Sequence, residues 1–213
     1  MLKTTNDERP TTKLSPQPLR LGILGSGKGS NFRALVEAAH KNNLSYEPVL
    51  VISDVESAGI LTLAEELGIT SKFIPPGFYK TKLSEEAEQQ FIFALQAAEV
   101  DFIALAGFMR VIKEPLLAAF PEKIINIHPS LLPAFPGLEA WKQALEANVP
   151  ETGCTVHYVD AGIDSGEILG QSRVPILPGD TAQTLHARIQ QAEHELYPRI
   201  IEEVVKKVRL NAS

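Results

Sequence analysis

Apolar residues along this chain come in short runs of strand length, separated by longer segments in which they recur at helical spacing. The runs that predict strands are "LRLGILG" (19–25), "EPVLVIS" (47–53), "SKFIP" (71–75), "DFIALAGF" (101–108) and "KIINIH" (123–128). After the first run, apolar positions fall at i, i+3, i+4 and i+7 from Phe32 to Ala39, which is the stripe of an amphipathic helix. Strands that alternate with helices predict a mostly parallel βαβ sheet.

The second part of the chain departs from this alternation. Beyond Gly137, two strand-like segments follow each other without a helix between them, which favours an antiparallel arrangement. The final helical segment contains Pro198, which predicts an interruption or kink there. The expected fold is α/β: a Rossmann-like, open, mostly parallel twisted sheet with helices on both faces and a C-terminal antiparallel extension. The segments concerned are helices at 30–43, 58–68, 84–100, after Pro115, at 138–148 and at 180–208, and strands at 153–160 and 167–176.

A single domain is expected from residue 19 to residue 213, because neither a repeat nor a long linker interrupts the pattern. Residues 1–18 are polar and contain proline, and they lack the apolar core of a signal peptide. This composition is typical of a disordered tail.

Composition and charge narrow the classes of function. The 213 residues include 44% hydrophobic and 22% charged residues, an ordinary globular balance. A net charge of −6 disfavours duplex nucleic acid as the main partner. No apolar run approaches the ~20 residues that span a bilayer. Cys154 is the only cysteine, so no intrachain disulfide forms, which suits a reducing cytoplasm. The sequence leaves a homodimer open.

The turn "GSGKGSN" (25–31) stands between the first strand and its helix, where backbone N–H groups and the helix dipole favour an anion. A Walker A motif fails here, because Gly29 stands where the magnesium-binding hydroxyl belongs. The dinucleotide pattern G-x-G-x-x-G fails as well, although Asp54 after the second strand resembles its ribose-binding acid. A phosphate site of neither type is the favoured interpretation, and a tight turn without a ligand is the alternative.

A second group of polar residues surrounds the end of the strand at 123–128. Asn126 and His128 lie two residues apart, so they share one face of that strand. The amide can donate to an oxyanion, and the imidazole can act as a general acid or base. A carboxylate from the loop "VDAGIDSGE", Asp160 or Asp164, would raise the pKa of His128. His157 is interpreted as structural, and no set of residues has a zinc-binding spacing.

Five stretches of the sequence, taken together, resemble a known protein family, although no single stretch is specific enough to show this alone. They are "GSGKGSNFRAL", "ALAGFMRVI", "NIHPSLLPAFPG", "TGCTVHYVDAGIDSGEILGQ" and "AEHELYP". In this order, from about Leu19 to Ile201, they resemble the phosphoribosylglycinamide formyltransferases. That family transfers a formyl group from the co-substrate 10-formyltetrahydrofolate, without a metal, to the amine of glycinamide ribonucleotide (GAR) in purine synthesis.

The resemblance implies roles for matching residues. The family's catalytic residues fall on Asn126, His128 and Asp164: the first two would stabilise the tetrahedral oxyanion, and Asp164 would raise the pKa of His128. The residues implied to bind GAR are Gly29, Ser30 and Asn31 at the phosphate and Glu193 at the ribose. The residues implied to bind the folate are Met109, Arg110, Val111, Ile112, Asn126, Val159, Asp160 and Asp164.

Two positions depart from the family pattern. The family's arginine at the start of the helix before "DFIALAG" is matched by Ser84, with Lys80 and Lys82 just upstream as alternative sources of positive charge. The histidines that follow "PGL" in the family are replaced by Glu139 and Trp141.

Three alternatives stay open at this stage. Methionyl-tRNA formyltransferase shares the Asn-x-His and Asp residues but adds a basic C-terminal domain. Formyltetrahydrofolate deformylase shares them behind an extra N-terminal domain. Since the sequence ends at Ser213 and begins only eighteen residues before the first strand, neither is favoured. The third alternative belongs to a different class: a nucleotide-binding module without catalysis. Such a module would bind ligand but show no formyl-transfer turnover.

Overall fold

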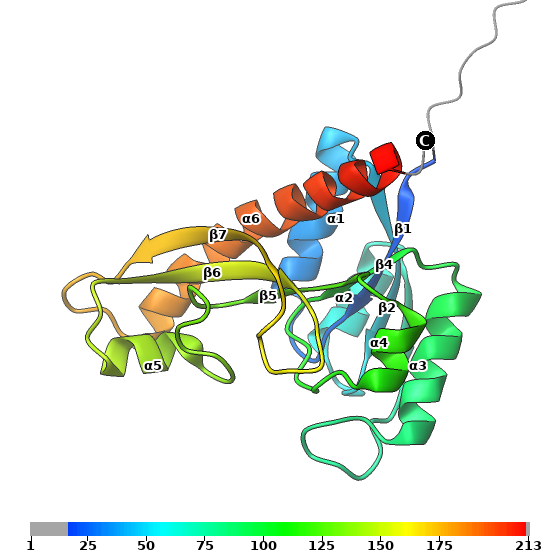
Figure 1. Ribbon diagram of the computed structural model, residues 1–213, viewed down its shortest axis with the longest axis horizontal. Helices are drawn as coiled ribbons and strands as arrows, with labels where there is room; N and C mark the ends of the chain where they lie inside the picture. The colour runs from blue at the N-terminus through cyan, green and yellow to red at the C-terminus, as the bar shows by residue number, and fades with distance from the viewer. Residues whose placement is uncertain (1–16, 212–213) are drawn as a thin grey trace, which may run out of the picture.

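The computed structural model describes residues 17–211, which form one seven-stranded sheet in the order β3-β2-β1-β4-β5-β6-β7 (Figure 1). The strands are β1 (Leu19–Leu24), β2 (Tyr46–Ser53), β3 (Thr70–Phe73), β4 (Phe102–Leu105), β5 (Ile124–His128), β6 (Glu151–Tyr158) and β7 (Ile168–Pro175). The helices are α1 (Ser30–Asn42), α2 (Gly59–Glu66), α3 (Glu85–Ala97), α4 (Glu114–Ala119), α5 (Ala140–Glu146) and α6 (Ala182–Asn211). Strands β1 to β5 pair in parallel, whereas β6 and β7 are antiparallel. The predicted α/β fold with an antiparallel extension is confirmed.

Alternating side chains of the strands divide the core between the two faces of the sheet. One cluster joins the sheet to α1, α2 and α6, and the other joins it to α3 and α4 (Figure 1). On β5, Ile125 and Ile127 belong to the first cluster and Ile124 to the second. Asn126 and His128 have the same parity as Ile124, so they leave the sheet on the α3 and α4 face.

The loops that follow the central strands meet at the carboxyl edge of the sheet. The Ser26 amide, after β1, donates to the Gly107 carbonyl, after β4, over 3.1 Å. The Ser26 hydroxyl accepts from the Met109 amide over 2.9 Å. The glycine-rich turn and the 106–112 loop are therefore bonded directly to each other, at the edge where open α/β sheets carry their ligand sites.

Helix α6 continues through Pro198 as far as Asn211, so the predicted interruption is wrong, whereas the alternative of a kink at Pro198 stays a prediction. A proline removes only one intrahelical hydrogen bond, and burial of the next turn offsets that cost. Tyr197 is fully buried, and its hydroxyl lies 3.0 Å from the Leu105 carbonyl of β4 and 2.9 Å from the Ile125 carbonyl of β5. Packing on the sheet thus holds the helix together across the proline.

Residues 1–16 and 212–213 lie outside the described part of the chain, so the predicted tail falls almost wholly outside it. Within residues 17–211, no helix combines the length and apolar character needed to cross a membrane.

Candidate active site

The antiparallel pairing of β5 with β6 brings a second histidine to the two predicted residues. Asn126 stands directly opposite His157 in the strand register, and His128 stands opposite Thr155. Directly opposed side chains of an antiparallel pair share one face of the sheet. The Asn126 amide nitrogen accordingly lies 3.1 Å from Nε2 of His157. The structure therefore places His157, interpreted from the sequence as structural, in contact with a predicted catalytic residue.

His128 is buried between two acceptors. Its Nδ1 lies 3.3 Å from Oδ2 of Asp164, and its Nε2 lies 2.9 Å from the Phe135 carbonyl oxygen. A carbonyl and a carboxylate accept hydrogen bonds but cannot donate them. Nε2 of His128 therefore acts as the donor to the Phe135 carbonyl, and Nδ1 faces the Asp164 carboxylate.

Asp164 connects both histidines to the loop that covers them. Its Oδ2 also accepts from the Gly137 amide over 2.8 Å, and its Oδ1 lies 3.7 Å from Nε2 of His157. The residue adopts a left-handed backbone conformation with φ +50°, which Asp tolerates better than most residues. One carboxylate thus positions the 129–137 loop and faces His128.

His157 favours its neutral form. Its Nδ1 lies 2.8 Å from the Tyr158 carbonyl, and the side chain is buried. Burial lowers its pKa, although the Tyr158 carbonyl and the Asp164 carboxylate act in the opposite direction. An uncharged imidazole has one donor nitrogen and one acceptor nitrogen, so the two contacts of His157 require opposite roles.

The glycine-rich turn leads into α1 and reaches a buried carboxylate of α6. Gly29 occupies the N-cap position with φ +83°, and Ser30 begins the helix. The Asn31 amide nitrogen donates to Oε2 of Glu193 over 2.9 Å. Burial raises the pKa of Glu193 to about 7, and the Asn31 hydrogen bond lowers it in part. The structure thus brings together Gly29, Ser30, Asn31 and Glu193, which the resemblance assigns to GAR.

The four residues of the 109–112 segment differ in what their side chains and backbone contact. Met109 is exposed, Val111 donates from its amide to the Thr81 carbonyl over 2.9 Å, and Ile112 is buried in the α3 and α4 cluster. The side chain of Arg110 turns inward: Nε lies 2.7 Å from Oδ2 of Asp54. The segment therefore offers its backbone and the Met109 side chain, rather than a free guanidinium, to a ligand.

Asp54 is a buried carboxylate with two partners from different loops. Besides the Arg110 guanidinium, it accepts from the Ser26 hydroxyl over 2.5 Å. The same guanidinium donates to the Tyr79 carbonyl over 2.9 Å and to the Lys80 carbonyl. Asp54 thus joins the glycine-rich turn, the 109–112 segment and the loop before α3, and it does not extend into an open ribose site.

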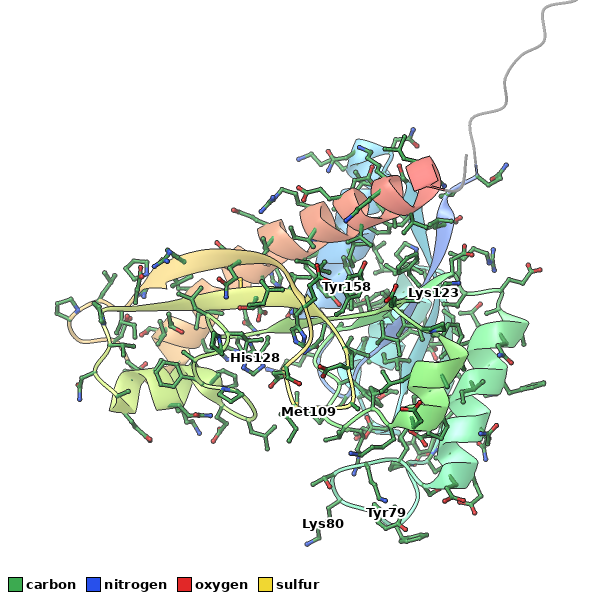
Figure 2. The ribbon with its side chains drawn as sticks, in the orientation of Figure 1. Tyr79, Lys80, Met109, Lys123, His128 and Tyr158 are labelled. Atoms are coloured by element: carbon green, nitrogen blue, oxygen red, sulfur yellow. The ribbon has the colours of Figure 1, made fainter. Side chains whose placement is uncertain are left out.

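The loop before α3 projects from the body, with Tyr79 and Lys80 toward its tip (Figure 2). Lys82 lies with Nζ 4.2 Å from the centre of the Tyr79 ring. Ser84 is buried, and its hydroxyl caps α3 by accepting from the Ala87 amide over 3.2 Å. Lys80 is exposed and Lys82 is half-buried, whereas the Ser84 side chain is engaged in the helix cap.

The loop between β6 and β7 supplies the remaining predicted residues. The Val159 amide donates to the Ile124 carbonyl over 2.9 Å, which attaches the start of the loop to β5. Asp160 is exposed and accepts from the Ser165 hydroxyl over 2.8 Å and from the Gly162 amide over 3.0 Å. Asp160 shapes the loop, whereas Asp164 faces the histidines. Within residues 17–211, no group of three His, Cys, Asp or Glu side chains is arranged to hold a metal ion.

Residues 19–201 match the sequence profile of the family described as formyl transferase. This chain belongs to the formyl transferase family. It is 42% identical over 186 residues to the phosphoribosylglycinamide formyltransferase of Bacillus subtilis, covering 87% of this chain and 94% of that protein. The crystal structure of glycinamide ribonucleotide transformylase 1 from Symbiobacterium toebii aligns with a TM-score of 0.85 at 42% identity, covering 91% of this chain and 90% of that one.

A further relative of this formyl transferase is much longer. The chain is 46% identical over 196 residues to the trifunctional purine biosynthetic protein adenosine-3 of Drosophila pseudoobscura pseudoobscura. The match covers 90% of this chain but only 14% of that protein. The chain therefore corresponds to one part of the trifunctional protein.

Three features of this formyl transferase site were not assigned from its sequence. The Asn126–His157 contact depends on strand register across 31 residues, which the sequence pattern does not encode. The Phe135 carbonyl and the Gly137 amide are backbone groups, which have no residue signature. Asp54 was noticed as an acid after a strand, but only the structure shows that Arg110 is its partner.

Proposed function

We propose that this chain is a phosphoribosylglycinamide formyltransferase, which transfers the formyl group of 10-formyltetrahydrofolate to the amine of GAR. The products are formyl-GAR and tetrahydrofolate, in de novo purine (IMP) biosynthesis. The proposal is carried by two observed groups, the cluster of Asn126, His128 and Asp164 and the separate Asn31–Glu193 pair, in a chain that spans 94% of the Bacillus subtilis enzyme. We place this reaction in the cytoplasm, with GAR and 10-formyltetrahydrofolate as the partners of the protein.

The reaction exchanges one carbon–nitrogen bond for another. The GAR amine attacks the formyl carbon, and the carbonyl oxygen becomes an oxyanion as the tetrahedral intermediate forms. Collapse of this intermediate breaks the bond to N10 of the folate. The amine loses one proton and N10 gains one, through His128 or through a held water. No oxidant or metal takes part in this balance.

Asn126 and His128 stabilise the oxyanion in this proposal. The Asn126 amide nitrogen has a second N–H besides the one directed at His157, and the imidazolium of His128 supplies a charged donor. One oxyanion donor typically contributes ~3–4 kcal/mol of barrier reduction. Because Nε2 of His128 already donates to the Phe135 carbonyl, the formyl oxygen replaces that carbonyl when the substrates bind. Asp164 keeps His128 charged and holds the covering loop through Gly137.

The two substrates bind on opposite sides of this cluster. Gly29, Ser30 and Asn31 hold the GAR phosphate with backbone and side-chain donors, and Glu193 accepts from the ribose hydroxyls. Oδ1 of Asn31 is buried without a partner among residues 17–211, so it is available to a ligand hydroxyl.

The pterin lies along the backbone of the 109–112 segment and the loop from Val159 to Asp164, with Asn126 at its reactive end. Lys80 or Lys82 supplies the positive charge expected near Ser84, since the Ser84 side chain is buried in its helix cap.

A substrate panel tests the proposed function. Purified protein is offered 10-formyltetrahydrofolate with GAR, with charged initiator tRNA, or with water alone, and tetrahydrofolate release is followed. Turnover with GAR alone is expected, and Asn126→Ala is the inactive reference. Release of tetrahydrofolate without an acceptor would identify a deformylase, transfer to tRNA would identify a methionyl-tRNA formyltransferase, and ligand binding without turnover would identify a binding module.

A further inference from the structure

We propose that His157 is a positioning residue that fixes the Asn126 amide with its nitrogen toward the reacting centre. The proposal rests on the role given above to Asn126 in oxyanion stabilisation. It concerns a side chain that neither donates to the substrate nor changes its own protonation during the reaction.

The first step of the argument is the geometry of the strand pair. Asn126 of β5 and His157 of β6 are direct partners in the antiparallel register. His157 is only 2% exposed, so its ring cannot turn toward solvent without disturbing the sheet. The 3.1 Å contact between the Asn126 amide nitrogen and Nε2 of His157 is therefore held by the backbone on both sides.

The second step is an accounting of protons. Nδ1 of His157 lies 2.8 Å from the Tyr158 carbonyl, which can only accept, so Nδ1 carries a hydrogen. A neutral ring then leaves a lone pair on Nε2, and the partner at 3.1 Å must donate to it. Only the nitrogen of the Asn126 amide can do so. Turning the amide over would set its oxygen against that lone pair.

The third step follows from the neighbouring charge. Oδ1 of Asp164 lies 3.7 Å from Nε2 of His157, which is beyond hydrogen-bond distance. A second proton on His157 would point at Asp164 and at the Asn126 N–H together, and it would compete with His128 for the carboxylate. The groups that face the ring are the Tyr158 carbonyl from β6, Asn126 and His128 from β5, and Asp164 and Asp160 from the β6–β7 loop. A neutral His157 satisfies both of its hydrogen bonds, to the Tyr158 carbonyl and from the Asn126 amide.

The functional consequence concerns the hydrogen bond from the Asn126 amide to the substrate oxygen. With one N–H of the Asn126 amide nitrogen held by His157, the second N–H of that nitrogen is left for the substrate oxygen. Without an acceptor at His157, a buried donor remains unpaired or the amide turns over, and either outcome weakens the transition state more than the ground state.

A nuclear magnetic resonance measurement on the intact wild-type protein tests the proton accounting directly. In uniformly ¹⁵N-labelled protein, long-range ¹H–¹⁵N correlations distinguish the two neutral tautomers of histidine. The His157 signals are assigned by their disappearance in His157→Gln. We expect protonated Nδ1 and unprotonated Nε2 at the assay pH. Protonated Nε2 would overturn the proposal, whatever the activity of the protein.

Kinetics of two variants test the consequence. His157→Phe keeps a ring but removes the acceptor, whereas His157→Gln places an amide oxygen near the position of Nε2. For His157→Phe we expect kcat to fall about 10- to 100-fold, with the KM values of GAR and 10-formyltetrahydrofolate changed less than about threefold. His157→Gln is expected to recover most of this loss. Equal losses in the two variants, or wild-type kcat in His157→Phe, would overturn the proposal.

Two controls separate this proposal from the proposed function. His186→Phe changes a half-buried histidine that stacks on Trp141 at a ring distance of 3.8 Å, outside the site, and should leave kcat unchanged. If Asn126→Ala is fully active, the role of Asn126 fails, but the tautomer measurement still reports on His157. If His157→Phe does not fold, the tautomer in the wild type and the kcat of His157→Gln decide the outcome.

Discussion

Asn31 and Glu193 are joined by a 2.9 Å hydrogen bond from the amide nitrogen to the carboxylate, although 162 residues separate them in the sequence. The contact fastens the start of α1 to the middle of α6. Burial raises the pKa of Glu193 to about 7, so its protonation changes within the range of ordinary assays.

The stability of the protein should therefore depend on the protonation of Glu193. Its folded-state pKa of about 7 lies above the ordinary glutamate value of 4.5, so protonation of the carboxyl favours the folded state. This contribution is fully present below pH 4.5 and is lost as the pH rises through about 7, a change of about 3 kcal/mol at most. Glu193→Gln should unfold at the same temperature as the wild type near pH 4 and at a higher temperature at pH 8. Calorimetric melting curves that coincide at both pH values would contradict the assignment.

Removing the charge of Asp164 should reduce turnover more than binding. Asp164→Asn keeps the shape of the side chain but removes the carboxylate 3.3 Å from Nδ1 of His128. We expect kcat to fall about 100-fold, or about 3 kcal/mol of transition-state stabilisation, with a smaller change in the KM of GAR. His128→Ala combined with Asp164→Asn should be far from additive, because the two residues act as a unit.

Single-turnover formyl transfer measures both Asp164 effects. The matched control is Asp160→Asn, which removes an exposed carboxylate of the same loop that bonds only within the loop. At saturating 10-formyltetrahydrofolate, Asp160→Asn should retain most of the single-turnover rate, and an effect on its folate contact should appear in the KM of the folate. A larger loss in Asp160→Asn than in Asp164→Asn would reverse the assignment of the two carboxylates.

Two glycines of the same turn should respond differently to an added methyl group. Gly29 has φ +83°, and a Cβ there would lie 2.9 Å from Cγ1 of Ile60, whereas a Cβ on Gly27 meets nothing within 4 Å. Gly29→Ala should raise the KM of GAR at least about tenfold through backbone strain and displacement of the turn, with the KM of the folate nearly kept. Gly27→Ala should resemble the wild type. Steady-state kinetics with each substrate varied in turn would show the difference, and equal effects of Gly29→Ala on both substrates would argue against a phosphate site.

The ion pair of Asp54 and Arg110 should contribute strongly to the free energy of unfolding, because the Asp54 carboxylate is almost inaccessible to solvent. The side chain of Asp54 is 1% exposed, and that of Arg110 is 16% exposed. Arg110→Met leaves a buried carboxylate without its cation and should destabilise the fold by about 3 kcal/mol or more. Arg199→Met, which breaks an exposed pair with Glu203, should cost less than about 1 kcal/mol. Urea unfolding of the two variants tests this contrast, and similar losses would show that burial does not set the strength of the Asp54 pair.

The sequence predicted the elements well where one-dimensional periodicity carries the information. The stripe from Phe32 to Ala39 is buried as expected, and the run of apolar residues at 123–128 forms β5. The N-cap of α1 is Gly29, which makes no side-chain hydrogen bond there, although Ser30 and Asn31 next to it are residue types that usually cap helices. A left-handed N-cap depends on the conformation of the turn, which no propensity at a single residue reports.

The candidate site was predicted less completely than the fold. Residues two apart on β5 were expected to share a face, and the parity of the core confirms that Asn126 and His128 do so. Their other partners come from β6 and from two loops, where register and loop conformation decide which atoms meet. Arg110 illustrates the limit: the resemblance implies that it contacts the folate, and only the structure shows that its guanidinium is paired with Asp54.

The shared carboxylate of Asp54 also connects the two proposed substrate sites physically. The glycine-rich turn is attached to it through Ser26, and the 109–112 segment is attached through Arg110. A ligand that shifts one of these segments acts on the other through the same buried group. Whatever factor GAR contributes to the affinity for the folate, the folate must contribute equally to the affinity for GAR. The contacts of Ser26 and Arg110 with Asp54 give any such reciprocal effect a direct route between the two segments.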